Sequence, residues 1–130
     1  MAPGSKAVIR QVKTLYQLGT VGGLSDEELL GQFVAWRGED AEDAFAAVVG
    51  RHGPMVLRVC RRILTDSHDA DDAFQVTFLV LARKARSIAR REQLANWLYG
   101  VAVRTANEVR KSAARRRARE AHVELIARAD

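Results

Sequence analysis

The stretch HDADDAFQVTFL, residues 68–79, decides the fold, because an acidic cluster runs directly into an almost wholly apolar segment. Asp66 or Ser67 can cap a helix here, and the helix is expected to run to about Ala85. A helix that is apolar on so many sides is expected at the centre of a bundle. Its predicted apolar stripe comprises Phe74, Phe78, Leu81 and Ala85, widened by Val76, Leu79 and Val80.

Helical patterns also fill the chain on both sides of this stretch. Ser25-Asp26-Glu27-Glu28 is a capping-box pattern that predicts a helix ending at Gly38. A second helix is expected from about Asp40, and Gly53-Pro54 is expected to break or kink it before a helix over residues 55–64. The last long helix is expected from near Gln93 to as far as Arg119.

The sequence therefore predicts an all-α protein, a compact helical bundle of about four main helices plus a short N-terminal helix over residues 5–18. The expected organisation has three parts. Residues 1–23 form an amphipathic extension and linker, residues 24–119 form the helical domain, and residues 120–130 form a C-terminal linker or tail.

Basic side chains gather in one part of the chain. Residues 1–82 contain 8 basic and 11 acidic residues, whereas residues 83–119 contain 12 basic and 2 acidic ones. The net charge of +5 therefore conceals a local charge of +10. Such a block indicates a polyanionic partner, nucleic acid first, although a charge run is more often a solvated helix face.

The sequence shows no pattern of an enzyme, a metal site or a membrane protein. His52, His68 and His122 lack the spacing of metal ligands, and the single Cys60 fits a small core residue. A Gly-rich phosphate loop, a signal peptide and a run of about 20 apolar residues are all missing. We expect a cytoplasmic, non-enzymatic protein without a cofactor or metal.

The acidic cluster continues as a row of polar residues. Asp69, Asp72 and Gln75 stand three residues apart and are expected on one helix face. Acids near a helix N-terminus also favour the positive end of its dipole, which explains Asp69 better than it explains Asp72 and Gln75. The residues alone leave open whether the row serves the helix or a basic partner surface.

The connector 85–93 and the last helix carry the candidate nucleic-acid contacts. Arginines at this density can follow a phosphate backbone, and connectors on rigid supports often hold recognition residues. Trp97 lies on the inner apolar stripe and is expected in the core, whereas Tyr99 lies off that stripe. The DNA-binding candidates are Arg83, Lys84, Arg86, Ser87, Arg90, Arg91, Arg104, Asn107, Arg110, Lys111 and Arg115.

Two motifs together resemble region 2 of bacterial sigma factors of the extracytoplasmic-function group. The segment DADDAFQVTFL, residues 69–79, is similar to the region 2.2 signature, which usually has Asp-Ala-Glu-Asp, two apolar residues, Gln-Glu, one residue and Phe. The segments HGPMVL, residues 52–57, and NWLYGVA, residues 96–102, are similar to those of sigma factors found in planctomycetes. The resemblance covers roughly residues 24–119.

The resemblance implies a domain that binds core RNA polymerase and melts promoter DNA in transcription initiation. Asp69, Asp72 and Gln75 would contact the clamp coiled coil of the largest polymerase subunit, with Phe78 in the core. The connector 85–93 would capture an extruded base of the minus-ten element on the non-template strand, and the next helix would follow the strands. Such factors also have a region 4, which these residues do not contain, and an anti-sigma factor is a further expected partner.

Two positions depart from the family pattern. Val76 stands where Glu is usual, and Arg104 stands where many members have Asn. Arginine cannot accept a hydrogen bond from a base edge, so the promoter preference common in the family is not carried over. From the residues alone, two other classes stay open: a helical nucleic-acid-binding regulator that does not bind polymerase, and a protein-binding helical adaptor.

Overall fold

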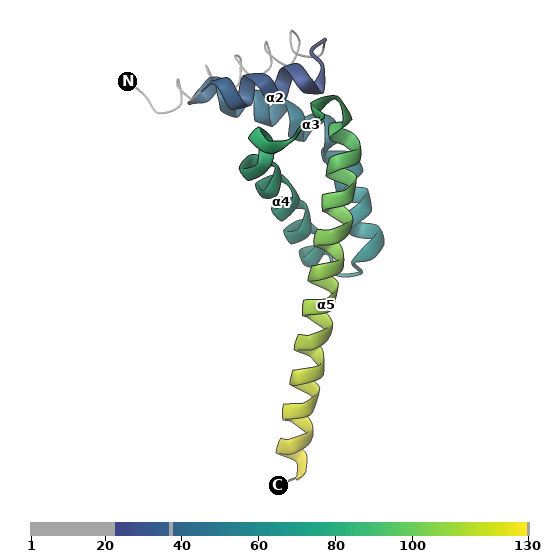
Figure 1. The fold of residues 1–130 in the computed structure, drawn as a ribbon. Coiled ribbons are helices and arrows are strands. Elements are labelled where there is room, and N and C mark those ends of the chain that lie inside the picture. The colour runs from purple at the N-terminus through teal and green to yellow at the C-terminus, as the bar shows by residue number, and fades with distance from the viewer. Residues whose placement is uncertain (1–22, 37, 130) are drawn as a thin grey trace, which may run out of the picture. The chain divides into compact units, whose positions relative to one another are not determined.

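The computed structural model describes residues 23–36 and 38–129, and these are all-α, as predicted (Figure 1). The predicted helix over residues 5–18 lies outside the described residues. The elements are the α-helices α2 (Asp26–Ala35), α3 (Glu39–Ile63), α4 (Ser67–Lys84) and α5 (Leu94–Ala129), and the short 3-10 helices η1 (Ala85–Ser87) and η2 (Arg91–Gln93).

The chain divides into two compact units, and the division falls inside α3. Of the described residues, the first unit contains those up to Gly53 together with Ala82–Leu94, and the second contains Pro54–Leu81 together with those from Ala95 onward. Fully buried side chains occur in both. They include Leu29, Leu30, Val48 and Leu94 in the first unit, and Val56, Cys60, Leu81 and Leu98 in the second.

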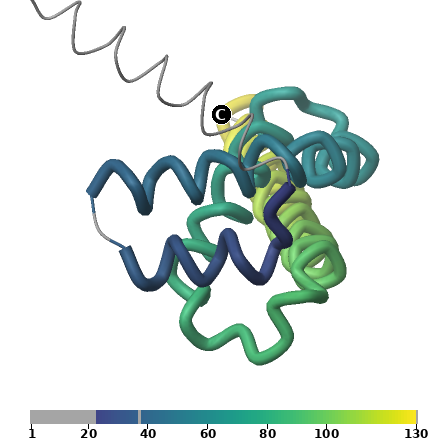
Figure 2. Tube along the Cα trace, turned by 90° about the horizontal axis from the view of Figure 1, so that it is seen from above, coloured from purple at the N-terminus to yellow at the C-terminus, as the bar shows by residue number. Residues whose placement is uncertain are grey.

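In the first unit, α2 begins with the predicted capping box. Ser25 Oγ accepts a hydrogen bond from the Glu28 amide at 3.1 Å, and the Ser25 amide donates to Glu28 Oε1 at 3.3 Å. Asp26 Oδ1 then accepts from Arg51 Nη1 at 3.0 Å and lies 2.8 Å from His52 Nε2. These contacts fasten the start of α2 to α3, beside which it lies in Figure 2.

The turn between α2 and α3 depends on Gly38. The helix α2 ends at Ala35, three residues earlier than predicted, and Gly38 has a φ of 71°. Glycine adopts this left-handed conformation without the steric cost that a Cβ adds. The Gly38 carbonyl then accepts from the Glu42 amide at 3.1 Å, so this residue begins α3 rather than ending α2.

Of the break or kink predicted at Gly53-Pro54, the break is wrong, because α3 is a single helix from Glu39 to Ile63 with Pro54 inside it. Proline removes the amide that would bond the carbonyl four residues earlier, which belongs to Gly50. Both Gly50 and Pro54 are exposed, so water can hydrate that carbonyl and the helix continues.

In the second unit, α4 is capped by Asp66, which is one of the two residues predicted for that role. Its Oδ1 accepts from the amides of His68 at 2.8 Å and Asp69 at 3.1 Å. These backbone hydrogen bonds lower the pKa of the Asp66 carboxyl, because they favour its charged form, and the bond from the Asp69 amide has the largest effect.

Cys60 is buried, and this burial raises the pKa of its thiol, as suits a core residue.

The helix α5 is longer than predicted and continues ten residues beyond Arg119, to Ala129. Its side chains from residue 114 onward are exposed, and no other described element of its unit lies beside its yellow end in Figure 1. Tyr99 is exposed as expected, whereas Trp97 is half-buried. None of the described helices combines the length and the apolar character that a bilayer crossing needs.

Candidate functional site

One side of α4 presents a mixed polar and apolar surface to solvent, here called the α4 outer face. It consists of Asp72, Gln75, Val76 and Leu79, all of which are exposed. Two of these are large apolar side chains, since Val76 is 41% and Leu79 61% exposed. The expectation that Val76 and Leu79 belong to a buried stripe is therefore wrong.

Helical geometry explains this error. Successive residues turn by about 100° around a helix axis, so residues 72, 75, 76 and 79 fall on the same side. The opposite side holds the residues that are buried. These are Ala70, Ala73, Thr77, Phe78 and Leu81, and the Thr77 hydroxyl donates to the Ala73 carbonyl at 2.7 Å. The small side chains of Ala70 and Ala73 are the sequence signal that could have identified the packed side of this helix.

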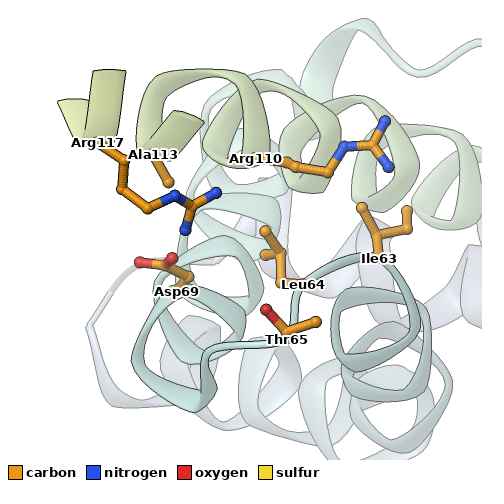
Figure 3. A pocket seen from close by; sticks show the side chains of 7 residues that line it. All are labelled: Ile63, Leu64, Thr65, Asp69, Arg110, Ala113 and Arg117. Atoms are coloured by element: carbon orange, nitrogen blue, oxygen red, sulfur yellow. The ribbon is translucent and has the colours of Figure 1, made fainter. Parts of the chain in front are cut away.

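Asp69 stands at one end of the predicted row, with Asp72 between it and Gln75 around the helix. Steps of three residues drift by about 60° each around a helix, so Asp69 and Gln75 differ by about 120°. Asp69 is half-buried and lines a pocket of about 240 Å³ within the second unit. In Figure 3 the Arg117 guanidinium is turned toward the Asp69 carboxylate, while the Arg110 side chain extends the other way. The pocket is lined by Ile63, Leu64, Thr65, Asp69, Arg110, Ala113 and Arg117.

The connector 85–93, here called the basic loop, is built from η1, η2 and the residues between them. Ala85 and Ile88 are buried, and the Ser87 hydroxyl donates to the Lys84 carbonyl at 2.8 Å. Arg86 Nη2 donates to the Val34 carbonyl of α2 at 3.2 Å. Both η1 and η2 pack on α2 within the first unit. Ser87 and Arg86 therefore make contacts inside the protein, in addition to their predicted role at DNA.

Other candidates in this segment are open to solvent. Arg90 is exposed, and its guanidinium makes no hydrogen bond within the part of the chain that the structure describes. Arg83 and Lys84 are exposed in the last turn of α4, where positive charge also favours the helix dipole. Arg91 is half-buried.

On α5, three of the predicted cations form one line, here called the α5 basic line. They are Arg104, Lys111 and Arg115, and all three are exposed. Lys111 follows Arg104 by seven residues and Arg115 follows it by eleven, and both spacings return to the same side of a helix. Asn107 is half-buried at the edge of this line, and Lys111 lies 3.9 Å from the carboxylate of Glu108. Arg110 does not share this side, because it lines the pocket together with Ala113 and Arg117.

The exposed surfaces have the composition of binding surfaces. Over residues 23–36 and 38–129 no group of three His, Cys, Asp or Glu side chains is placed to hold a metal ion. The exposed features are an acidic and apolar face on α4 and arginine-rich surfaces on the loop and α5. The α4 outer face suits a protein surface that is both basic and apolar. The arginine-rich surfaces suit a polyanion.

Comparison with known families identifies a match to the sigma-70 region 2 family over residues 48–119. The match contains α4, the basic loop and α5 up to Arg119, and it begins within α3. Searches of curated proteins and of solved structures gave no match. Because the matched residues make up more than half of the chain, the protein belongs to the sigma-70 region 2 family, whose role lies in transcription initiation.

Proposed function

We propose that this protein binds core RNA polymerase through the α4 outer face and holds the non-template strand of the minus-ten element through the basic loop and the α5 basic line. The polymerase partner is the clamp coiled coil of the largest subunit, as in the sigma factors that the motif 69–79 resembles. Promoter melting follows from capture of one extruded base by the basic loop, which offsets the few kcal/mol that extrusion costs.

The exposed apolar pair Val76 and Leu79 is the observation that supports polymerase binding most. Exposed apolar residues rimmed by polar ones are typical of protein interaction sites. Here the rim consists of Asp72 and Gln75, which suit a partner surface containing arginine. Val76 stands where the family usually has Glu, so this chain replaces one charged contact by an apolar one.

Asp69 has a different part in this proposal. Its carboxylate faces Arg117 at the rim of the pocket, so it reaches the polymerase only at the edge of the contact. Its predicted role at the polymerase stays a prediction, with a smaller expected effect than that of Asp72.

The arginines support the nucleic-acid part of the proposal. Exposed cations lie on the loop at Arg90 and along α5 at Arg104, Lys111 and Arg115. Cations in a line can follow a phosphate backbone, but backbone contacts do not select a sequence. Base selection is therefore assigned to the loop, where Arg86, Ser87, Arg90 and Arg91 surround the short turns.

A charge reversal on α4 tests the polymerase contact. Asp72→Arg places a positive charge on the outer face, where a basic clamp surface repels it, and core binding is expected to weaken while the fold persists. Glu120→Arg is the matched control, because it makes the same reversal of charge at an exposed position of α5 and not on α4. Equal core binding by Asp72→Arg and the unmodified chain in a pull-down contradicts the assignment.

Two measurements separate this proposal from its rivals. A nucleic-acid-binding regulator binds single-stranded DNA but does not co-purify with core polymerase. A helical adaptor shows neither core binding nor salt-sensitive DNA binding. The proposed function requires both core binding and salt-sensitive DNA binding, with core binding weakened in Asp72→Arg and DNA binding retained.

A further inference from the structure

Arg86 has a structural partner that its predicted role at DNA does not explain. Its Nη2 donates to the Val34 carbonyl at 3.2 Å, across 52 residues of sequence. Val34 is the penultimate residue of α2, so its carbonyl is one of the four that a helix leaves without an intrahelical donor. The last turn of α2 contains no basic residue. Arg86 therefore brings to the negative end of α2 the positive charge that α2 lacks.

A second arginine of the loop also lies on α2. A Cβ built on Gly31 would be 3.9 Å from Arg91 Nη1, so the Arg91 guanidinium rests over a helix position that has no side chain. Gly31 in the middle of α2 costs helix stability relative to Ala, by the entropy that glycine loses. Both short helices of the loop thus pack on α2, and Arg86 supplies the side-chain hydrogen bond that joins η1 to it.

Contacts at Ser87 and Ile88 also hold the middle of the basic loop. The Ser87 hydroxyl donates to the Lys84 carbonyl at 2.8 Å, and Ile88 is buried. Arg90 stands between the two anchored turns and is exposed. Among the four polar candidates of the basic loop, Arg86 and Ser87 donate hydrogen bonds within the first unit, Arg91 is half-buried, and Arg90 is exposed.

We propose that Arg86 is a positioning residue, whose guanidinium ties η1 to the C-terminal end of α2, so that α2 determines the loop conformation that selects a base. Arg90 is then the residue of the loop that contacts the DNA strand. This inference rests on the proposed function, in which the basic loop reads the minus-ten element. It assigns to α2, which lies outside the matched residues 48–119, a part in base selection.

The first experiment measures the anchor in the free, full chain by amide hydrogen exchange, without DNA or polymerase. Arg86→Met keeps the length of the side chain but removes its donors, and amides of residues 85–93 and of the last turn of α2 are expected to exchange about fivefold faster, the factor that one net hydrogen bond supplies. Arg90→Met is the matched control and leaves these rates unchanged. Unchanged rates in a folded Arg86→Met chain overturn the anchor.

The second experiment uses the complex with core polymerase and single-stranded minus-ten oligonucleotides that differ in one base. Arg86→Met is expected to reduce the ratio of affinities between preferred and other bases while leaving the salt slope intact. Arg90→Met is expected to lower the log–log salt slope by about 0.7, the value for one phosphate contact on a single strand. A reduced salt slope with unchanged base ratio in Arg86→Met identifies a phosphate contact and overturns the proposal.

Arg86→Lys provides a second variant that keeps the charge. Lysine has no planar fork, so it retains phosphate attraction but fits the Val34 carbonyl less well. The positioning role predicts an intermediate base ratio, whereas a phosphate contact predicts a salt slope equal to that of the unmodified chain and an unchanged base ratio. If the exchange rates respond to Arg86→Met but no variant of the loop alters base preference, the anchor stands and the reading function of the loop fails.

Discussion

Leu79 is the residue of the α4 outer face whose contribution to the proposed polymerase contact can be calculated most directly. It is 61% exposed, so most of its surface remains to be buried by a partner. Full burial of a leucine side chain is worth about 1.5–3 kcal/mol, and the part still exposed here leaves roughly 1–2 kcal/mol. Truncation to alanine removes most of that side chain, or about 1–1.5 kcal/mol, so Leu79→Ala is expected to raise the Kd for core polymerase about fivefold to tenfold.

The assay is a fluorescence titration of the labelled chain with core polymerase, beside urea unfolding of the free chain. Because Leu79 faces solvent, its removal is expected to change the free energy of unfolding by no more than about 0.5 kcal/mol. Leu125→Ala is the matched control, since Leu125 is 68% exposed on α5, away from the α4 outer face. An unchanged Kd for Leu79→Ala, or equal weakening by both variants, refutes the reasoning.

Three further predictions concern the fold and the DNA surface. Gly38→Ala is expected to lower the free energy of unfolding by about 1 kcal/mol because Gly38 has a positive φ, whereas Gly50→Ala, in an open helical position, is expected to raise it by about 0.5–1 kcal/mol; a stabilising Gly38→Ala in urea unfolding contradicts this. The pKa of Asp66 is lower in the folded chain than its ordinary 3.8, so the ionised cap stabilises the fold above that pH and this stability is lost as pH falls through the folded pKa. Unfolding curves from pH 6 to 2.5 are expected to show the unmodified chain more stable than Asp66→Asn at the upper end and equal to it at the lower end, and a constant gap is the opposing result. Lys111→Ala and Arg115→Ala are each expected to lower the log–log salt slope for single-stranded DNA by about 0.7, and Arg110→Ala by less, as anisotropy titrations can measure; equal slopes for all three would place Arg110 on the DNA surface.

The local signals in the sequence predicted the helix beginnings well. Ser25 and Glu28 form their capping box, and Asp66 caps α4, because such caps depend on residues within one turn of each other. The error at Pro54 has a local cause as well. Proline in a helix is costly, but an exposed position lets water replace the missing amide, and exposure is a property of the fold rather than of the dipeptide.

The functional surfaces were predicted less completely. Asp72 and Gln75 are exposed as a partner contact requires. Val76 and Leu79 were predicted to widen the apolar stripe of a central helix, yet they are exposed, because apolar character alone does not say which side of a helix is covered. The anchor between Arg86 and Val34 joins residues 52 positions apart, and no pattern in the sequence pairs a side chain with a distant backbone carbonyl. The role of Arg110 beside the pocket likewise depends on where α5 lies against α4 in the second unit.

Competition for core RNA polymerase tests the central claim most directly. The full chain is titrated against a complex of core polymerase and a labelled, complete sigma factor, and release of the label is followed. We predict saturable displacement by the unmodified chain and by Glu120→Arg, with displacement by Asp72→Arg shifted to higher concentration. Failure of the folded, unmodified chain to displace the labelled factor at any concentration would contradict polymerase binding through α4.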